Sequence, residues 1–112
     1  MKASSPANRK DKASIMDIDR LIHEPARLMI MAHLFLVEKA DFIYLMRQTD
    51  LTWGNLSAHL TKLEEGGYLK VDKGYKGRKP NTMLQLTPKG RQAFQSYTEQ
   101  MKSVLNEVPD GG

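Results

Sequence analysis

Residues 41–87 constrain the fold of this chain most strongly, because they contain two closely spaced helix patterns followed by a basic hairpin pattern. The second helix pattern covers residues 52–65, where three leucines recur at i, i+4 and i+7: Leu56, Leu60 and Leu63. Leucines at this spacing share one side of an α-helix and form a buried stripe. We therefore expect this helix to pack one side on a core and to leave its other side open.

The open side of this helix carries small or polar residues: Gly54, Asn55, Ala58, Thr61 and Lys62, with Ser57 and His59 on its flanks. A surface helix that faces only water is usually dense with Glu and Lys. A small, neutral face with many hydrogen-bonding groups suits a helix that enters a groove and meets base edges. We predict that the helix over residues 52–65 lies in the major groove of double-stranded DNA.

Positive charge is concentrated directly after this helix. Residues 70–79 contain five basic side chains and one acidic side chain, so their net charge is five minus one, or +4, which equals the formal charge of the whole chain. The basic residues are Lys70, Lys73, Lys76, Arg78 and Lys79. Such a run on its own also fits a solvated loop. Its position after a helix with a polar open side favours contact with DNA phosphates.

Capping residues and glycines mark where the helices begin and end. Three residues precede helix patterns and are predicted N-caps: Asp41, Thr52 and Thr87. Gly66 and Gly67 are expected to end the helix that precedes the hairpin, because glycine adopts the left-handed conformation of a helix C-terminus. A last helix is predicted over about residues 88–107, with a proline at its first position.

The hairpin is predicted as strands over residues 68–75 and 82–86, joined by a turn over residues 77–81. The order of helix, turn, helix and hairpin predicts a winged helix-turn-helix, an α+β fold that is mostly helical. We expect a three-helix core, a β-hairpin wing over residues 70–82, and terminal dimerisation helices. The whole domain is predicted to span residues 15–108.

The N-terminal part of the chain divides into three segments. Residues 1–14 are polar and aperiodic, and we predict a disordered basic tail there. Apolar residues at helical spacing then predict a short first helix: Ile15, Ile18 and Leu21 or Ile22. Residues 26–37 form the next predicted helix, which is apolar around almost its whole circumference. Such a helix must be covered on more than one side, and we expect a second subunit to supply part of the cover.

The last helix carries apolar residues spaced three and four apart in alternation, which is the heptad seam of helices that pack lengthwise. This seam fits either a helix that lies on its own domain or a contact between two subunits. Its length of about 30 Å by helical rise favours the dimer. The predicted dimer interface contains Leu28, Met31, Phe35, Phe94, Tyr97, Met101, Val104, Leu105 and Val108.

Composition excludes several classes of function. No apolar run approaches the roughly 20 residues that cross a bilayer, and the N-terminus has no apolar signal core. The chain has no cysteine, which excludes disulfides, thiolate catalysis and zinc sites built on sulfur. We expect a cytoplasmic protein without a membrane partner. It contains no glycine-rich phosphate loop, no carboxylate pair near a histidine and no serine elbow, so we predict a non-enzyme without a cofactor.

Three motifs resemble those of the bacterial and archaeal winged-helix transcriptional regulators related to the MarR and ArsR families: GNLSAHLTKLEEGGYL at residues 54–69, GRKPNT at 77–82 and LTPKG at 86–90. The resemblance covers about residues 17–105 and is nearest to the minimal, stand-alone DNA-binding form. It implies a homodimer that binds a pseudo-palindromic operator, usually as a repressor, and effectors vary among its members. Metal-sensing members use cysteine thiolates or histidine and carboxylate sets on a terminal helix. The last helix here has no histidine, so no metal site is expected.

The predicted DNA contacts of the recognition helix are Thr52, Asn55, Ser57, Ala58, His59, Thr61 and Lys62, and those of the wing are Lys73, Lys76, Arg78 and Lys79. Asn55 matches a residue that pairs bidentately with adenine, although it also fits a helix cap. Arg78 suits a narrow minor groove. His59 fits a semi-buried histidine equally well, and His23 and His33 are interpreted as packed histidines. Trp53, the sole tryptophan, fits packing of the turn better than stacking on a base.

One rival interpretation belongs to another functional class. A winged helix can serve as a protein-interaction module that does not bind DNA specifically. Such a module would have an acidic or apolar recognition face. The polar face of the helix and the basic wing favour DNA instead.

Overall fold

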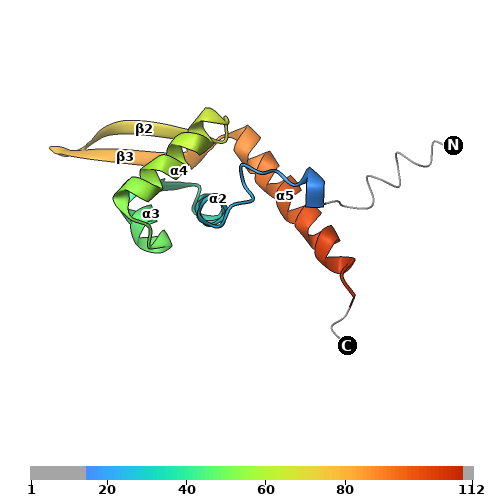
Figure 1. The fold of residues 1–112 in the computed structure, drawn as a ribbon. Coiled ribbons are helices and arrows are strands. Elements are labelled where there is room, and N and C mark those ends of the chain that lie inside the picture. The colour runs from blue at the N-terminus through green and yellow to red at the C-terminus, as the bar shows by residue number, and fades with distance from the viewer. Residues whose placement is uncertain (1–14, 110–112) are drawn as a thin grey trace.

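Four α-helices and a three-stranded antiparallel sheet make up the described part of the chain, residues 15–109 of the computed structural model (Figure 1). The predicted tail at residues 1–14 lies outside this part. In chain order the elements are the 3-10 helix η1 (Ile15–Asp17), α2 (Pro25–Val37), β1 (Lys39–Asp41), α3 (Phe42–Thr49), α4 (Trp53–Glu65), β2 (Leu69–Lys76), β3 (Lys79–Leu86) and α5 (Pro88–Asn106). No helix among these residues is long and apolar enough to span a membrane.

Each α-helix begins after a residue whose side-chain oxygen accepts a hydrogen bond from the backbone N–H three residues later: Glu24, Asp41, Thr52 and Thr87. Such caps satisfy N–H groups that have no partner inside the helix. The three predicted N-caps are confirmed. The predicted end of α4 is also confirmed, because the chain turns at Gly66 and Gly67, and Gly67 has a φ of 84°.

The sheet corrects two predictions. It contains a third strand, β1, which the sequence did not indicate because three residues are too few to show an alternating pattern. The turn of the hairpin consists of Gly77 and Arg78 alone, instead of residues 77–81, since Lys76 already pairs with Lys79. Gly77 has a φ of 66° at the first central position, as a type II′ turn requires.

Pro80 favours a longer turn when the sequence is taken alone. It belongs to β3, where it pairs with Tyr75 of β2. A proline cannot donate a hydrogen bond to a neighbouring strand, so it is tolerated where a strand has only one partner. β1 pairs only with residues 83–85 of β3, and the tip of β3 is therefore an edge.

The hydrophobic core lies where α2, α3, α4, α5 and the sheet meet. Its fully buried large side chains are Ile22, Ile30, Met31, Leu34, Leu45, Leu56, Leu63 and Leu84. The predicted leucine stripe of α4 is confirmed, because Leu56 and Leu63 are fully buried and Leu60 is nearly so. Tyr97 of α5 also belongs to this core.

The predicted first helix is wrong beyond residue 17. Only η1 forms, and a turn follows in which the Asp19 carboxylate accepts hydrogen bonds from the backbone N–H groups of Leu21 and Ile22. Side-chain bonds of this kind compete with helix formation. The apolar residues that suggested a helix are explained by burial, because Ile18 and Ile22 both face the core from this turn.

Two members of the predicted dimer interface are wrong. Met31 and Tyr97 are buried inside the protomer itself, so they have no surface to offer a partner. The Tyr97 hydroxyl lies 2.8 Å from Nδ1 of His23, and Phe94 packs on Phe35 with ring centroids 5.1 Å apart. The first half of the apolar seam on α5 therefore holds this helix to its own domain.

A hydrogen bond joins the turn before α2 to the base of the hairpin. The Tyr68 hydroxyl donates to the Asp19 carboxylate. Burial, and secondly this hydrogen bond and the charge of Asp19, raise the pKa of Tyr68 from 10.0 to about 12. The neutral phenol therefore stabilises the fold below pH 10, and this contribution is lost as the pH rises toward about 12.

We expect Tyr68→Phe to lower the free energy of unfolding by about 1 kcal/mol at neutral pH, because one hydrogen bond is lost. The difference between the variant and the wild type should shrink as the pH rises from 10 to about 12. Urea unfolding at neutral pH and within this window measures both values. An equal difference at both pH values would contradict the role of the phenol.

Candidate nucleic-acid interface

Helix α4 turns its leucine stripe to the core and leaves a continuous polar side open. The residues exposed on that side are Thr52, Gly54, Asn55, Ala58, Thr61 and Lys62. The C-terminal end of the same helix exposes Glu64 and Glu65. These carboxylates repel phosphates, so the first two turns of α4 are the part suited to approach DNA.

The Asn55 side chain is free to contact a ligand. The hydroxyl of Thr52 caps α4 by accepting a hydrogen bond from the Asn55 backbone N–H at 3.2 Å. The Asn55 amide side chain makes no hydrogen bond to any residue within 15–109. The N-cap of α4 is therefore Thr52, and Asn55 does not have this role.

His59 lies on the other flank of α4 and is engaged within the protein. Its Nδ1 is 3.2 Å from a guanidinium nitrogen of Arg27 and 3.9 Å from the carboxylate of Glu24. The ring is half-buried. This geometry fits a semi-buried, partnered histidine better than a DNA contact.

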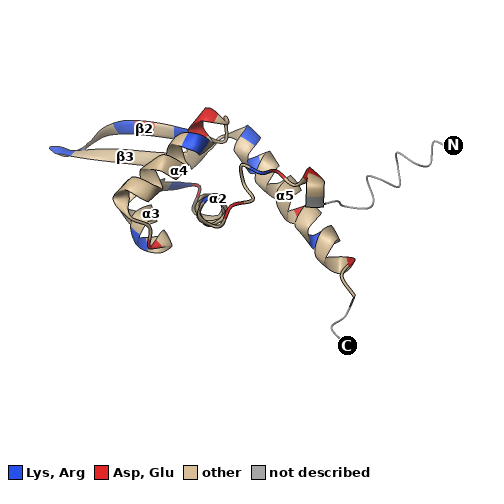
Figure 2. Cartoon of the chain, in the orientation of Figure 1, with Lys and Arg blue, Asp and Glu red and all other residues tan. Residues whose placement is uncertain are grey.

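The two faces of β2 differ in whether a lysine is paired with a carboxylate. Side chains alternate along a strand, and Leu69, Val71 and Lys73 share the face that looks toward α4. Lys70 and Asp72 share the opposite face, where their charged groups are 3.7 Å apart. Lys76, Arg78 and Lys79 gather at the exposed tip of the hairpin, as Figure 2 shows. The positive charge of the wing therefore lies at its tip and at Lys73.

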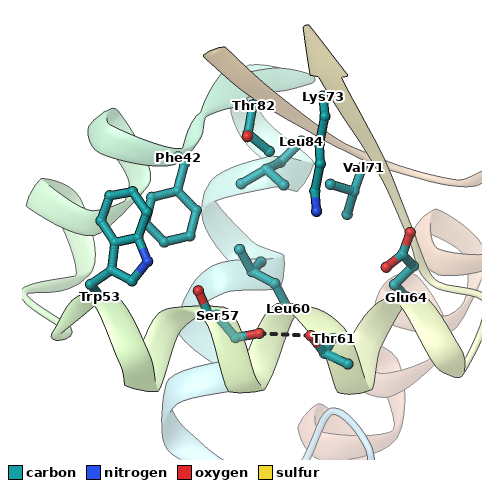
Figure 3. A pocket seen from close by; sticks show the side chains of 10 residues that line it. All are labelled: Phe42, Trp53, Ser57, Leu60, Thr61, Glu64, Val71, Lys73, Thr82 and Leu84. Atoms are coloured by element: carbon teal, nitrogen blue, oxygen red, sulfur yellow. Dashed lines mark hydrogen bonds between the residues drawn. The ribbon is translucent and has the colours of Figure 1, made fainter. Parts of the chain in front are cut away.

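A groove of about 340 Å³ separates α4 from the hairpin (Figure 3). It is lined by Phe42, Trp53, Ser57, Leu60, Thr61, Glu64, Val71, Lys73, Thr82 and Leu84. The Thr61 hydroxyl donates to the backbone carbonyl of Ser57 at 3.0 Å, so Thr61 is partly engaged inside the helix.

The large exposure of Trp53 is the feature of this surface that the sequence interpretation did not predict. Its ring lies on Phe42 with centroids 4.4 Å apart, as expected for a residue that packs the turn. Yet 61% of its surface stays exposed at the start of α4. The sequence signal for this exposure is spacing. Trp53 precedes Ser57 by four residues and Thr61 by eight, so the three side chains lie along one edge of the helix.

The described residues contain no cluster of three or more histidine, cysteine, aspartate or glutamate side chains that could hold a metal ion. The groups at the interface are hydrogen-bond donors and acceptors, lysine and arginine cations, and one exposed indole. Such a set can bind the phosphates of a nucleic acid and can form hydrogen bonds with the donors and acceptors on base edges.

Known proteins resemble this chain in sequence and in fold. The model of the family described as winged helix DNA-binding domain matches residues 26–105. Uncharacterized protein MJ0432 of Methanocaldococcus jannaschii is 37% identical over 89 residues, which are 80% of this chain and 97% of that protein.

Two solved structures extend the comparison. The transcriptional regulator homologue protein from Pyrococcus horikoshii OT3 superimposes with a TM-score of 0.76 at 33% identity, over 82% of this chain and 90% of that chain. A MarR-family transcriptional regulator from Silicibacter pomeroyi has a TM-score of 0.61 at 18% identity, over 82% of this chain and 61% of that chain. The predicted winged-helix fold is confirmed, and these regulators share it.

Proposed function

The chain belongs to the winged helix DNA-binding domain family, and from this premise we propose that it is a homodimeric repressor that binds a pseudo-palindromic operator. The family and the regulators of similar structure support a DNA-binding regulator. The observation that carries sequence-specific recognition is the free Asn55 side chain at the N-terminal end of α4, together with a hairpin whose basic tip is exposed.

In this proposal α4 enters the major groove with its first two turns. Asn55 reads a base edge, with adenine as the partner whose donor and acceptor it matches. Ser57, Ala58 and Thr61 line the same approach, and Lys62 and Thr52 contact phosphates, which position the protein without specifying sequence. The acidic end of α4 stays outside the groove.

The wing supplies the electrostatic part of the affinity. Arg78 is the second residue of the turn and lies at the very tip, where a guanidinium can enter a narrow minor groove. Lys76 and Lys79 flank it and contact phosphates.

We expect Arg78→Ala with Lys79→Ala to weaken binding to specific and non-specific duplexes alike. Each lost phosphate contact should flatten the dependence of log affinity on log salt concentration by about 0.9. Fluorescence anisotropy at several salt concentrations gives this slope. An unchanged slope in the double variant would place the wing off the DNA.

The proposed dimer contact uses the apolar surface that the protomer leaves open. Leu105 in the last turn of α5 is 61% exposed, and Val108, two residues beyond this helix, is 56% exposed. Leu36 at the end of α2 is 80% exposed. α5 has 19 residues and extends past the rest of the domain (Figure 1). The half-buried members of the predicted interface continue this surface: Leu28, Phe35, Phe94, Met101 and Val104.

A gel-shift experiment on fragments of the source genome at two salt concentrations tests the proposal. A repressor of this kind should retain a few fragments at the higher salt concentration and bind many others weakly at the lower one, because non-specific affinity comes from phosphates. Equal binding of all fragments at both concentrations would argue for a basic protein without an operator.

A further inference from the structure

The groove between α4 and the hairpin has a polar rim and an apolar floor (Figure 3). Its floor is formed by Leu60, Val71 and Leu84, and its rim is formed by Trp53 and Ser57 from α4 and by Lys73 and Thr82 from the hairpin. Lys73 and Thr82 are cross-strand neighbours. The groove therefore offers hydrogen-bond donors from both walls above a surface that favours apolar contact.

Trp53 forms the open end of this groove. One part of its ring packs on Phe42, and the larger part is exposed to solvent. Exposing so large an apolar ring is costly in water, and an indole carries one N–H donor at its edge. This side chain is suited to a ligand that combines an apolar surface with an acceptor.

The charge of the groove is graded along its length. Lys73 directs its ammonium group between the walls (Figure 3) and forms no ion pair with another described residue, whereas Lys70 on the opposite face pairs with Asp72. Glu64 lies at the end away from Trp53. An anion is therefore favoured from Trp53 to Lys73 and repelled beyond it.

We propose that this groove holds the sugar–phosphate backbone of one DNA strand, with Trp53 against a deoxyribose and Lys73 on a phosphate. The inference rests on the proposed function. If α4 lies in the major groove and the hairpin tip in the adjacent minor groove, the strand that separates the two grooves must pass between them. Trp53 thereby becomes a DNA contact in addition to its packing role on Phe42.

The single tryptophan makes the contact directly measurable. The probe is a short duplex of random sequence with a fluorescein label, because a backbone contact needs no particular bases. Anisotropy of the label reports binding, and quenching of Trp53 by acrylamide reports its exposure. We expect the quenching constant to drop as the duplex saturates the protein.

Two lysine variants provide the second measurement. Lys73→Gln and Lys70→Gln remove the same charge from the same strand, on opposite faces. We expect Lys73→Gln to reduce the salt slope by about 0.9 and Lys70→Gln to leave it nearly unchanged.

The outcomes separate the inference from the function on which it rests. If the duplex binds but Trp53 stays equally accessible and the two lysine variants behave alike, the strand does not lie in this groove and the inference is wrong, while DNA binding stands. If no duplex binds even at low salt, the proposed function is wrong and the inference falls with it.

Discussion

Replacing Leu105 and Val108 with aspartate should convert the protein into a monomer and weaken operator binding by about 100-fold or more. Each protomer would then bind its half-site without being held there by a partner on the other half-site. Both side chains are largely exposed in the protomer, so the substitutions should leave the fold intact. In a dimer contact they would bury two unpaired carboxylates, which is strongly unfavourable.

A matched control adds the same charge elsewhere on the helix. Gln95 and Asn106 of α5 are exposed, and their replacement by aspartate introduces two carboxylates without removing an apolar side chain. Sedimentation equilibrium and thermal melting of both double variants separate dissociation from unfolding. A wild-type protein that stays monomeric at micromolar concentration would contradict the dimer.

Asn55→Ala should lose roughly 1–3 kcal/mol on the operator, the value of one bidentate contact to a base. Binding to random duplexes should barely change, since that affinity comes from phosphates. Stability should also change little, because the hydroxyl of Thr52 caps α4. Gln92→Ala on the exposed side of α5 is the matched control, as it removes an amide far from the proposed interface.

The ratio of operator affinity to random-duplex affinity is the quantity to compare. If Asn55→Ala melts earlier and keeps the wild-type ratio, Asn55 has a structural role and other residues of α4 determine specificity.

The fold was largely predictable because its strongest signals are local. The leucine stripe of α4 and the capping side chains of α3, α4 and α5 act within one or two turns of their own helix. β1 was missed because its pairing with β3 joins residues more than forty positions apart. The first helix was overpredicted because the Asp19 carboxylate binds the backbone that a helix would use.

The surface roles were less accessible from the sequence. Met31 belongs to a helix that is apolar on all sides, and Tyr97 belongs to the apolar seam of α5. Only the packing of α2 and α5 shows that both face the protomer's own core. The position of His59 in the sequence fits a base contact, but Arg27, 32 positions away, lies beside its ring. Lys70 and Lys73 are equivalent as charges in the sequence, and the two faces of β2 distinguish them.

The most direct test of the central claim is selection of bound duplexes from a random-sequence library at physiological salt. A homodimer that reads DNA through two copies of α4 should enrich an inverted repeat whose half-sites are about 34 Å apart, one helical turn of DNA. The Asn55→Ala protein should lose the enrichment at one base pair of each half-site. Recovery of duplexes without any shared motif would contradict sequence-specific recognition by this helix.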